Sequence, residues 1–391
     1  DANGNGDFAY APPAGHLALC AANLPEPTIG PNQTETSTNH FNTILYTGNQ
    51  TARSETGVGF SPDLVWIKGR NATWSNSWFD TVRGPNRIIN SDWEPQAATA
   101  EERVVSNALT SFDSDGFSLG GGTTLESRNQ NNSGTNFVAW NWRAGGTPTA
   151  TNSSFQGAAP ISGAIMVDGV ASTASLPTAG RYPNKMSVNT KAGFSIVAYN
   201  APGLSAFTIP HGLTKAPEMV IIKNRETSTN HGQWVIGQNQ SGFTGQMYFS
   251  NLSFSTNSGS FYDTAPTNTL VSIGTDNTVN EGGDDFIMYC FHSVEGFSKI
   301  GKYDGNGLTD GAYIHTGFRP AWVMIKTYNQ NVTWFLVDNK RESYNGSRKR
   351  LLPSQYNTET GNYIELYSNG FKWISGSGTS SFNGTNYSYV Y

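Results

Sequence analysis

The chain has 391 residues with 24 basic and 29 acidic side chains, a net charge of −5, and 14% charged residues against about 25% in an average protein. Its aromatic content of 12% is too high for a disordered chain, and the acidic balance lacks the cationic face that binds nucleic acid. No apolar run approaches the ~20 residues of a membrane-spanning helix, so membrane insertion is not expected.

The first segment, residues 1–40, opens with DANGNGD, in which oxygen-bearing side chains alternate up to Gly6 as at the start of a calcium-binding loop. Position twelve, where such a loop is closed by a bidentate glutamate, is Pro12. The sequence therefore leaves calcium binding near Asp1 open. No two of the six histidines lie within five residues of each other, so no other metal site and no cofactor is predicted.

A unit that occurs three times dominates the rest of the chain. The pattern Pro-x-apolar-Val-apolar-Ile-Lys starts at Pro62, Pro217 and Pro320, and each copy predicts a strand with proline at its entrance. Three further landmarks occur at similar distances from each copy of this motif. They are an upstream tyrosine, a downstream strand that begins with tryptophan, and a final aromatic strand. These landmarks are Tyr46, Tyr199 and Tyr303; Trp78, Trp234 and Trp334; and FVAWNW from Phe137, FIMYCF from Phe286 and YSYVY from Tyr387.

The constant order of these landmarks predicts an all-β fold of three tandem β-sandwich-like repeats. The predicted parts are an N-terminal segment at 1–40, repeats at 41–146, 193–296 and 297–391, and a linker or arm at 147–192. Within the linker, GAIMVDGV is compatible with one strand. The stretch from Glu94 to Leu109 predicts a helix, treated as a surface insertion because the other repeats lack it.

Two fragments resemble catalytic motifs. GFSLG, with Ser118 at its centre, fits a serine-hydrolase elbow, but the following GGTTLESRN is not expected to form the helix that the elbow requires. GFSKIGKY approaches a phosphate-binding loop, but Tyr303 stands where Ser or Thr holds magnesium. No pair of carboxylates recurs in all three repeats. The sequence therefore predicts a protein that is not an enzyme.

Aromatic and basic side chains supply the candidate contact residues. Repeated strand positions indicate burial for Trp66, Trp140, Trp234, Trp322 and Trp334. Trp74 and Trp93 lie in polar loops and are candidates for an exposed glycan-binding platform. Arg348, Lys349 and Arg350 end the one basic cluster, which is either a solvated loop or a contact with an acidic glycan or a partner subunit. Cys20 and Cys290 are expected to be buried free thiols.

The stretches FSPDLVWIKGRN, NSGTNFVAWNWRAGG, GFSKIGKYDGNG and TGFRPAWVMIK resemble repeats of virion surface proteins from marine tailed bacteriophages. Such proteins are similar to tail fibres or other appendages, and the resemblance brings no catalytic residues. The opening GNGDFAYAPPAGHLALCAANLPEP is similar to the closing segment of a SPRY or concanavalin-like sandwich. This resemblance implies that residues 1–40 are a β fragment, the end of such a preceding domain, followed by a connector. Because Tyr391 aligns with Asn141 and Cys290 inside the final strand, these residues are expected to be an internal portion of a longer polypeptide.

The resemblance implies a non-enzymatic structural protein on the virion surface, a tail fibre or similar appendage that attaches to the host. Its expected partners are further copies of the chain as a homotrimer, other virion proteins and a host surface glycan. Two alternatives stay open at this point. One is a carbohydrate-binding or adhesive module on a cell surface, and the other is a polysaccharide depolymerase.

Overall fold

The computed structural model describes the whole chain except residues 15, 19, 21–22, 24–26, 31–32, 93–100, 154–158, 227–231, 250–252, 343–348, 362–363 and 375–382. Strands dominate the described residues, and the predicted all-β architecture of three sandwich-like repeats is confirmed. Among the described residues no helix is long and apolar enough to cross a membrane.

The first repeat is a sandwich of one large and one small antiparallel sheet. The large sheet has the order β1-β9-β3-β4-β5-β6 and the small sheet the order β2-β8-β7. The elements are β1 (Phe41–Thr47), β2 (Arg53–Thr56), β3 (Leu64–Gly69), β4 (Ser77–Asp80), β5 (Arg87–Asn90), β6 (Arg103–Val104), β7 (Leu109–Asp113), β8 (Gly116–Leu119), α1 (Leu125–Asn131) and β9 (Asn136–Trp142), preceded by the 3-10 turn η2 (Ser37–Asn39).

The second repeat places the strands in the order β11-β10-β12-β13-β20-β15-β16-β17-β18, faced by the two-stranded sheet β14-β19. Its elements are β10 (Ile165–Val167), β11 (Val170–Ala171), β12 (Lys185–Asn189), β13 (Phe194–Asn200), β14 (Phe207–Pro210), β15 (Met219–Asn224), β16 (Trp234–Gln238), η3 (Asn239–Ser241), β17 (Gly245–Tyr248), β18 (Ser255–Thr256), α2 (Ser258–Phe261), β19 (Leu270–Ile273), α3 (Asn277–Asn280) and β20 (Asp285–Phe291).

The third repeat has the sheets β21-β27-β23-β24 and β22-β26-β25. Its elements are β21 (Lys302–Asp304), β22 (Tyr313–His315), β23 (Trp322–Thr327), β24 (Phe335–Asp338), β25 (Ile364–Tyr367), β26 (Gly370–Trp373) and β27 (Ser388–Val390). The order β21-β27-β23-β24 matches β1-β9-β3-β4 and β13-β20-β15-β16, so the four central strands of each large sheet correspond.

One stacked aromatic pair marks the same place in every repeat. The tyrosine landmark of the first strand faces an aromatic residue of the last strand, with the ring planes within 17° of parallel. The pairs are Tyr46 with Phe137 at 5.2 Å, Tyr199 with Phe286 at 5.1 Å and Tyr303 with Tyr389 at 4.8 Å between ring centroids. Each tyrosine is also the direct ladder partner of its ring, which fixes the register of the two strands.

These ladders correct two alignments made from the sequence. Trp234 pairs with Lys223, whereas Trp78 pairs with Trp66, so the position of Trp234 is taken in the first repeat by Asn76. In the last strand Tyr389, not Tyr387, corresponds to Phe137. Tyr391 therefore takes the place of Ala139 and Met288, two residues before the predicted Asn141 and Cys290. Both errors arise because residues of the same type were aligned with each other, although they occupy different positions in the strand register of their repeats.

The interval 147–192 is not a linker with a single strand. It contributes β10, β11 and β12 to the large sheet of the second repeat, where β12 pairs with β13 over five residues. Met186 and Val188 of β12 are buried in the core of that sandwich. Short strands of this kind are held by backbone ladders and a few apolar contacts, so a Gly-, Ser- and Thr-rich composition does not exclude them.

Two further expectations are wrong for the described residues. In the described part of 1–40 no residue belongs to a strand, so no β fragment is seen at the N-terminus. The predicted helix from Glu94 to Leu109 falls partly outside the described residues, and its described part, 101–109, contains β6 and the start of β7 instead.

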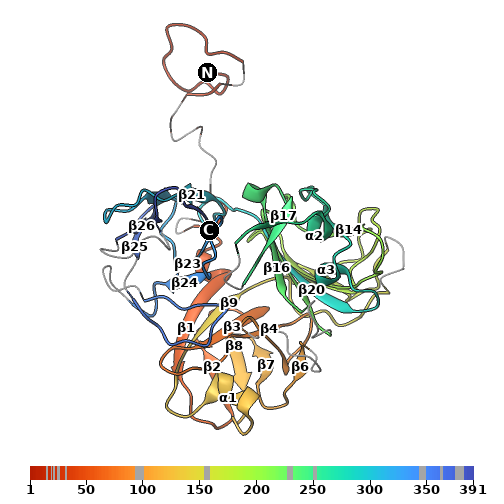
Figure 1. Cartoon of the computed structure of the whole chain (residues 1–391). Helices are drawn as coiled ribbons and strands as arrows, with labels where there is room; N and C mark the ends of the chain where they lie inside the picture. The colour runs from red at the N-terminus through yellow and green to blue at the C-terminus, as the bar shows by residue number, and fades with distance from the viewer. Residues whose placement is uncertain are drawn as a thin grey trace.

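The three sandwiches are grouped around a common centre, not stacked in a row (Figure 1). A single apolar cluster draws its side chains from all three large sheets, including Trp66 and Trp78, Ile221 and Trp234, and Trp334. Each sandwich also has its own internal core between its two sheets. The central strands are therefore buried on both faces, as the continuous apolar run FIMYCF predicted for β20.

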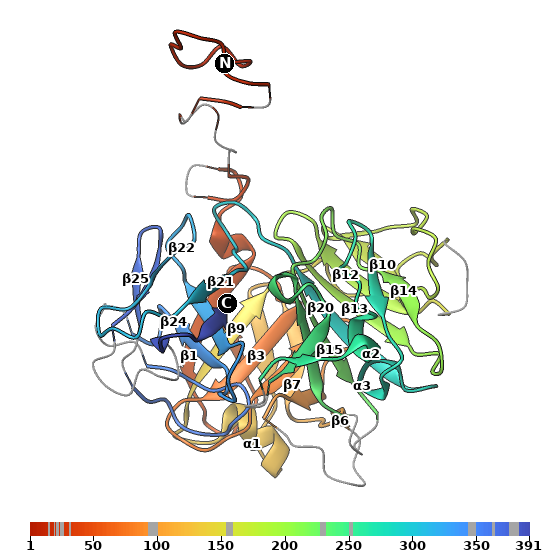
Figure 2. The ribbon, with the colours of Figure 1, turned by 45° about the horizontal axis from the view of Figure 1, so that its top comes forward.

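The N-terminal segment projects away from the three lobes in both ribbon views (Figures 1 and 2). Ile29 is fully buried in a small cluster with Ala192, Val294 and Phe297. These partners come from the start of the second repeat and from the connection between the second and third repeats. The segment is thereby attached at the end of the central junction where β1 begins.

Candidate functional site

The junction of the three repeats has approximate threefold symmetry, visible first in a ring of three hydrogen bonds. In each interface the residue at the start of the fourth strand donates its side-chain N–H to a backbone carbonyl of the neighbouring repeat. The bonds run from Asn76 Nδ2 to Leu352 O at 3.1 Å, from Trp234 Nε1 to Asn90 O at 3.0 Å and from Trp334 Nε1 to Tyr248 O at 2.7 Å. The first repeat thus binds the third, the second binds the first, and the third binds the second. The ring is closed within one chain.

A second ring of backbone bonds lies after the repeated motif. The bonds run from Glu359 N to Arg70 O at 2.9 Å, from Glu102 N to Arg225 O at 2.8 Å and from Phe254 N to Tyr328 O at 3.0 Å. Arg70, Arg225 and Tyr328 each stand eight residues after the proline of their motif. The three interfaces therefore share one backbone geometry despite different side chains.

Two of these interfaces are ionic. Arg225 donates from Nε and Nη2 to the Glu102 carboxylate, each over 2.9 Å, and Glu102 also accepts from Arg87 Nη1 at 2.7 Å. Burial opposes ionisation of Glu102, but the hydrogen bonds from Arg225 and the charge of Arg83 outweigh it and lower its pKa to about 2. At the corresponding interface Arg70 binds Glu359 through Nε and Nη2, both at 3.1 Å.

The interface between the third and second repeats is aromatic. Tyr328 and Phe254 stack with their centroids 4.7 Å apart and their planes 19° from parallel. This pair occupies the positions that carry arginine and glutamate in the other two interfaces. Offset stacking of two rings is worth about 0.5–1.5 kcal/mol beyond the burial of their area, so this interface is held without an ion pair at that place.

Two buried Asp–Arg pairs also form hydrogen bonds between repeats. Asp80 accepts from Arg83 Nε at 2.5 Å and from the hydroxyl of Tyr289 in the second repeat at 2.8 Å. Asp338 accepts from Arg341 Nε at 2.6 Å and from Nε1 of Trp140 in the first repeat at 3.1 Å. Burial works against the charge of Asp338, but the nearby Arg341 guanidinium lowers its pKa. Gln238 stands at the corresponding place in the second repeat.

The lysine that ends each repeated motif is fully buried. Lys68 Nζ donates to Trp74 O at 2.5 Å, Lys326 Nζ to Val332 O at 2.6 Å, and Lys223 Nζ to Gly232 O, so each amine binds the loop that joins the third and fourth strands. Burial lowers the pKa of Lys68 and Lys223 to about 8 and that of Lys326 to about 7. These bonds indicate that the three lysines share the role of fixing these loops.

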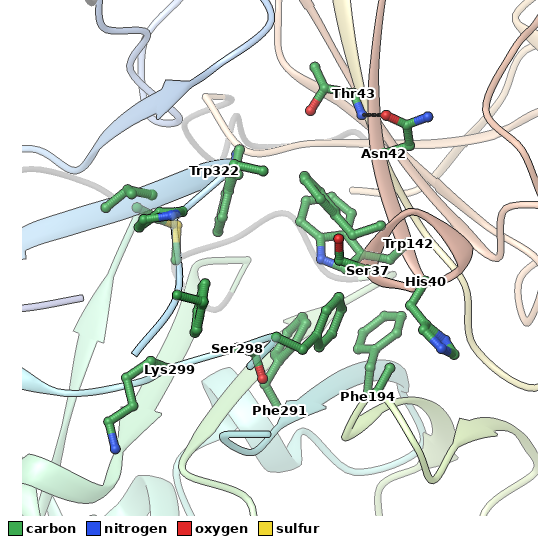
Figure 3. A pocket seen from close by; sticks show the side chains of 18 of the residues that line it. Ser37, His40, Asn42, Thr43, Trp142, Phe194, Phe291, Ser298, Lys299 and Trp322 are labelled. Carbon is green, nitrogen blue, oxygen red and sulfur yellow. Dashed lines mark hydrogen bonds between the residues drawn. The ribbon is translucent and has the colours of Figure 1, made fainter. Parts of the chain in front are cut away.

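A cavity of about 430 Å³ opens at one end of the junction (Figure 3). Its walls come from all three repeats and include Phe41, Trp142, Phe194, Phe291 and Trp322. In Figure 3 the aromatic side chains of these strands lie side by side, with Lys299 reaching away from them. The cavity is consistent with a local break in the symmetry: counting back from the stacked tyrosines, Ser298 corresponds to Phe41 and Phe194. A small hydroxyl side chain thus replaces a third aromatic ring.

The charged side chains that line this cavity are all cationic. They are Arg143, Lys299, Arg319 and Lys340, all exposed, and no Asp or Glu is among the lining residues. His40 and His292 also line it, and burial lowers the pKa of both, so both are neutral at pH 7. The arrangement gives an apolar aromatic interior with a positive rim.

Comparison with known families matches residues 36–167 and 168–391 to a family described as Domain of unknown function (DUF7483). The chain belongs to the DUF7483 family. The boundary between the two matches lies in the β10–β11 hairpin, so the first match contains the first repeat and the second contains the other two. A comparison with curated proteins finds no match.

In this DUF7483 chain the structure describes three of the five predicted contact residues, Trp74, Lys349 and Arg350. Trp74 is partly buried against the core of the first sandwich and donates from Nε1 to Thr135 Oγ1 at 3.2 Å, so it is not an exposed platform. Trp93 and Arg348 lie outside the described residues. Lys349 is 43% exposed and lies 3.5 Å from Glu342 Oε1, and Arg350 forms an isolated bridge with Thr360.

The remaining motifs are structural where they are described. Ser118 lies within β8 and donates to Asp113 Oδ2 at 2.6 Å, not at a strand-to-helix turn. The helix α1 does follow it, contrary to expectation, but begins only at Leu125 after a Thr124 cap. The Asp1 carboxylate accepts backbone N–H bonds from Asn3, Asn5 and Ala18, and among the described residues no cluster of three metal-binding side chains occurs.

The expected burial of the five repeated tryptophans holds for four of them, while Trp322 is only partly buried and lines the cavity. Of the thiols, Cys290 is buried and Cys20 is half-buried, and both are free. Sequence reasoning did not identify the arginines that form ion pairs between repeats. Arg70 and Arg225 stand at the same distance from their motif, and that shared spacing was the available signal.

Proposed function

We propose that the chain is a non-enzymatic structural module of a virion surface appendage, such as a tail fibre, that contributes to host attachment. The observation that carries this proposal is the closed threefold junction, in which three sandwiches form one head with the N-terminal segment leaving it at one end (Figure 2). Such a head suits the tip of an appendage, because three groups of loops are held in a fixed relation around one attachment point.

The features that recur in all three repeats support a structural role. The elements that recur are the stacked aromatic pair, the buried lysine and the interface bonds, and all three act in folding and packing. A shared catalytic function would instead require shared acid, base or nucleophilic groups around a cavity. The cavity at the junction has no carboxylate among its lining residues, and its His40, His292 and Ser298 do not recur at matching positions of all three repeats.

The expected homotrimer stays a prediction, as does the contact with a host glycan. A single chain already closes the threefold ring, so further copies are not needed to complete the junction. A homotrimer of the chain would join three such heads and raise the valency of attachment. Analytical ultracentrifugation of the purified protein distinguishes one head from three.

The deciding experiment is to locate the protein on particles. Antibodies raised against the purified head should label a distal appendage of intact particles in immunogold electron microscopy, and soluble head should reduce adsorption of particles to host cells. Absence of the protein from purified particles would overturn the proposal. Labelling of a cell surface instead would favour the adhesive module, and release of reducing sugars from host polysaccharide would favour the depolymerase.

A further inference from the structure

We infer that the cavity at the junction is a binding site for an organic anion with an apolar body, such as an acyl or aryl carboxylate. Its apolar part would lie between the aromatic walls and its charged group at the cationic rim. The inference is independent of the attachment role, because it concerns the ligand chemistry of one cavity and not the location of the protein.

The interior of the cavity fits an apolar body. Small-molecule sites are commonly clefts of about 300–1,000 Å³ with mostly apolar and aromatic walls, and this cavity of about 430 Å³ is within that range. Phe41 and Trp142 lie 4.9 Å apart, and Trp142 meets Trp322 edge-on at 5.4 Å. On the opposite wall Phe194 and Phe291 stack at 4.7 Å. Rings from separate repeats thus face one shared space.

The rim fits a negative charge. Arg143, Lys299, Arg319 and Lys340 form no ion pair with any residue that the structure describes, and they gather in a protein whose net charge is −5. The interface arginines Arg225 and Arg341, by contrast, are paired with carboxylates. An unneutralised group of cations at the mouth of a low-dielectric cavity attracts an anion and focuses its field there.

The wall also contains polar atoms that the described chain leaves unused. Trp322 Nε1 and His292 Nε2 are buried and have no hydrogen-bond partner among the described residues. Buried donors and acceptors in proteins are normally satisfied, so such atoms call for a physical account. Both atoms are covered by neighbouring side chains and lie behind the cavity surface, so the inference is carried by the aromatic walls and the cationic rim.

An acyl or aryl anion is favoured over an acidic sugar because of the walls. A sugar carries hydroxyl groups around its ring, and burying them without partners is costly. The lining is mainly aromatic and aliphatic in the interior and is charged only at the rim. An amphipathic anion matches that division of polarity along its length.

The test is calorimetric titration of the whole protein with decanoate, below its micelle concentration. We expect saturable binding of one molecule per chain, at least tenfold tighter than decanol, which has the same tail without the charge. Binding should weaken as salt is added, because the charges at the rim are screened. Equal binding of decanoate and decanol, or uptake without saturation, would overturn the proposal. Binding of galacturonate in place of decanoate would do the same.

Two kinds of variant separate the rim from the interior. The double change Arg143→Gln and Arg319→Gln should weaken decanoate binding about tenfold, which corresponds to about 1.4 kcal/mol. The matched control is Arg128→Gln with Lys185→Gln, which removes two partly exposed positive charges in α1 and β12, neither of which lines the cavity, and should leave binding unchanged.

Ser298→Phe restores the third ring and should abolish binding by filling the space. Ser298 also bridges Val294 N and His292 O, so Ala321→Phe, at another lining position, is the second filling variant. Each variant is first checked for an unchanged circular dichroism spectrum and melting temperature. Folded filling variants that bind decanoate as the native protein does would refute the assignment of the site.

Discussion

Glu102 offers the sharpest test of how the second and first repeats are held together. Its carboxylate faces three guanidinium groups and holds Arg225 by two hydrogen bonds of 2.9 Å. Its pKa is lowered from the ordinary 4.5 to about 2, and one pKa unit corresponds to about 1.36 kcal/mol. The ionised carboxylate therefore stabilises the folded state by about 3 kcal/mol at pH 7, and Glu102→Gln should lower the free energy of unfolding by that amount.

The pH dependence of this difference follows from the direction of the shift. Because the folded-state pKa lies below the unfolded one, the stabilisation is complete above pH 4.5 and is lost as the pH falls toward 2. Urea unfolding followed by tryptophan fluorescence should give a difference of about 3 kcal/mol between the native protein and Glu102→Gln at pH 7. The difference should become smaller from pH 4.5 downward.

The control is Glu295→Gln, which changes an exposed carboxylate without an ion pair in the described part of the chain. It should alter the free energy of unfolding by less than about 0.5 kcal/mol. A loss below about 1 kcal/mol for Glu102→Gln, the level of an ordinary surface pair, would refute the reasoning. So would a loss that is the same at pH 6 and pH 3.

Three other predictions concern the whole molecule. Because the repeats share one central core, calorimetry should show a single cooperative transition, and three separate transitions would contradict the closed junction. The pKa values of about 8, 8 and 7 for Lys68, Lys223 and Lys326 lie below the ordinary 10.5, so the unfolded chain binds more protons and stability should rise from pH 7 to pH 9. In urea unfolding, the midpoint of Lys326→Met should rise less between pH 7 and pH 9 than the midpoint of the native protein. An equal rise in both would show that Lys326 does not contribute to this pH dependence. Burial raises the pKa of the Cys290 thiol, so a disulfide reagent should modify Cys20 first in the native protein, and equal rates for both would be inconsistent with the fold.

Strand identity was predictable because the local pattern decides it. The motif from Pro62, Pro217 and Pro320 marks β3, β15 and β23, each with proline before the strand and polar turns after it. The continuous apolar runs also indicated strands covered on both faces. The outer face of each large sheet is covered by the other two repeats. The residues of a strand such as LVWIK indicate that an apolar partner is present, but they do not indicate whether that partner is another sheet.

The cavity and the interfaces depend on the register in which the strands pair, and alignment by residue type does not give that register reliably. Aligning Trp78 with Trp234 by residue type moved the first repeat by two positions and concealed the role of Asn76. Trp74 was misjudged because its neighbours are polar, whereas its ring lies against an apolar cluster and its indole N–H is satisfied by Thr135. Side-chain environment here is set by residues distant in sequence.

The closed ring of interfaces has a consequence for how such a head can change. In an assembly of identical subunits every substitution appears at all symmetric positions together, so a cavity-forming change would open three gaps at once. Here the same place carries Phe41, Phe194 and Ser298, and a change in one affects only its own third of the ring. Fusion into one polypeptide therefore lets a symmetric scaffold acquire a single asymmetric feature while the other two positions keep the lobes together.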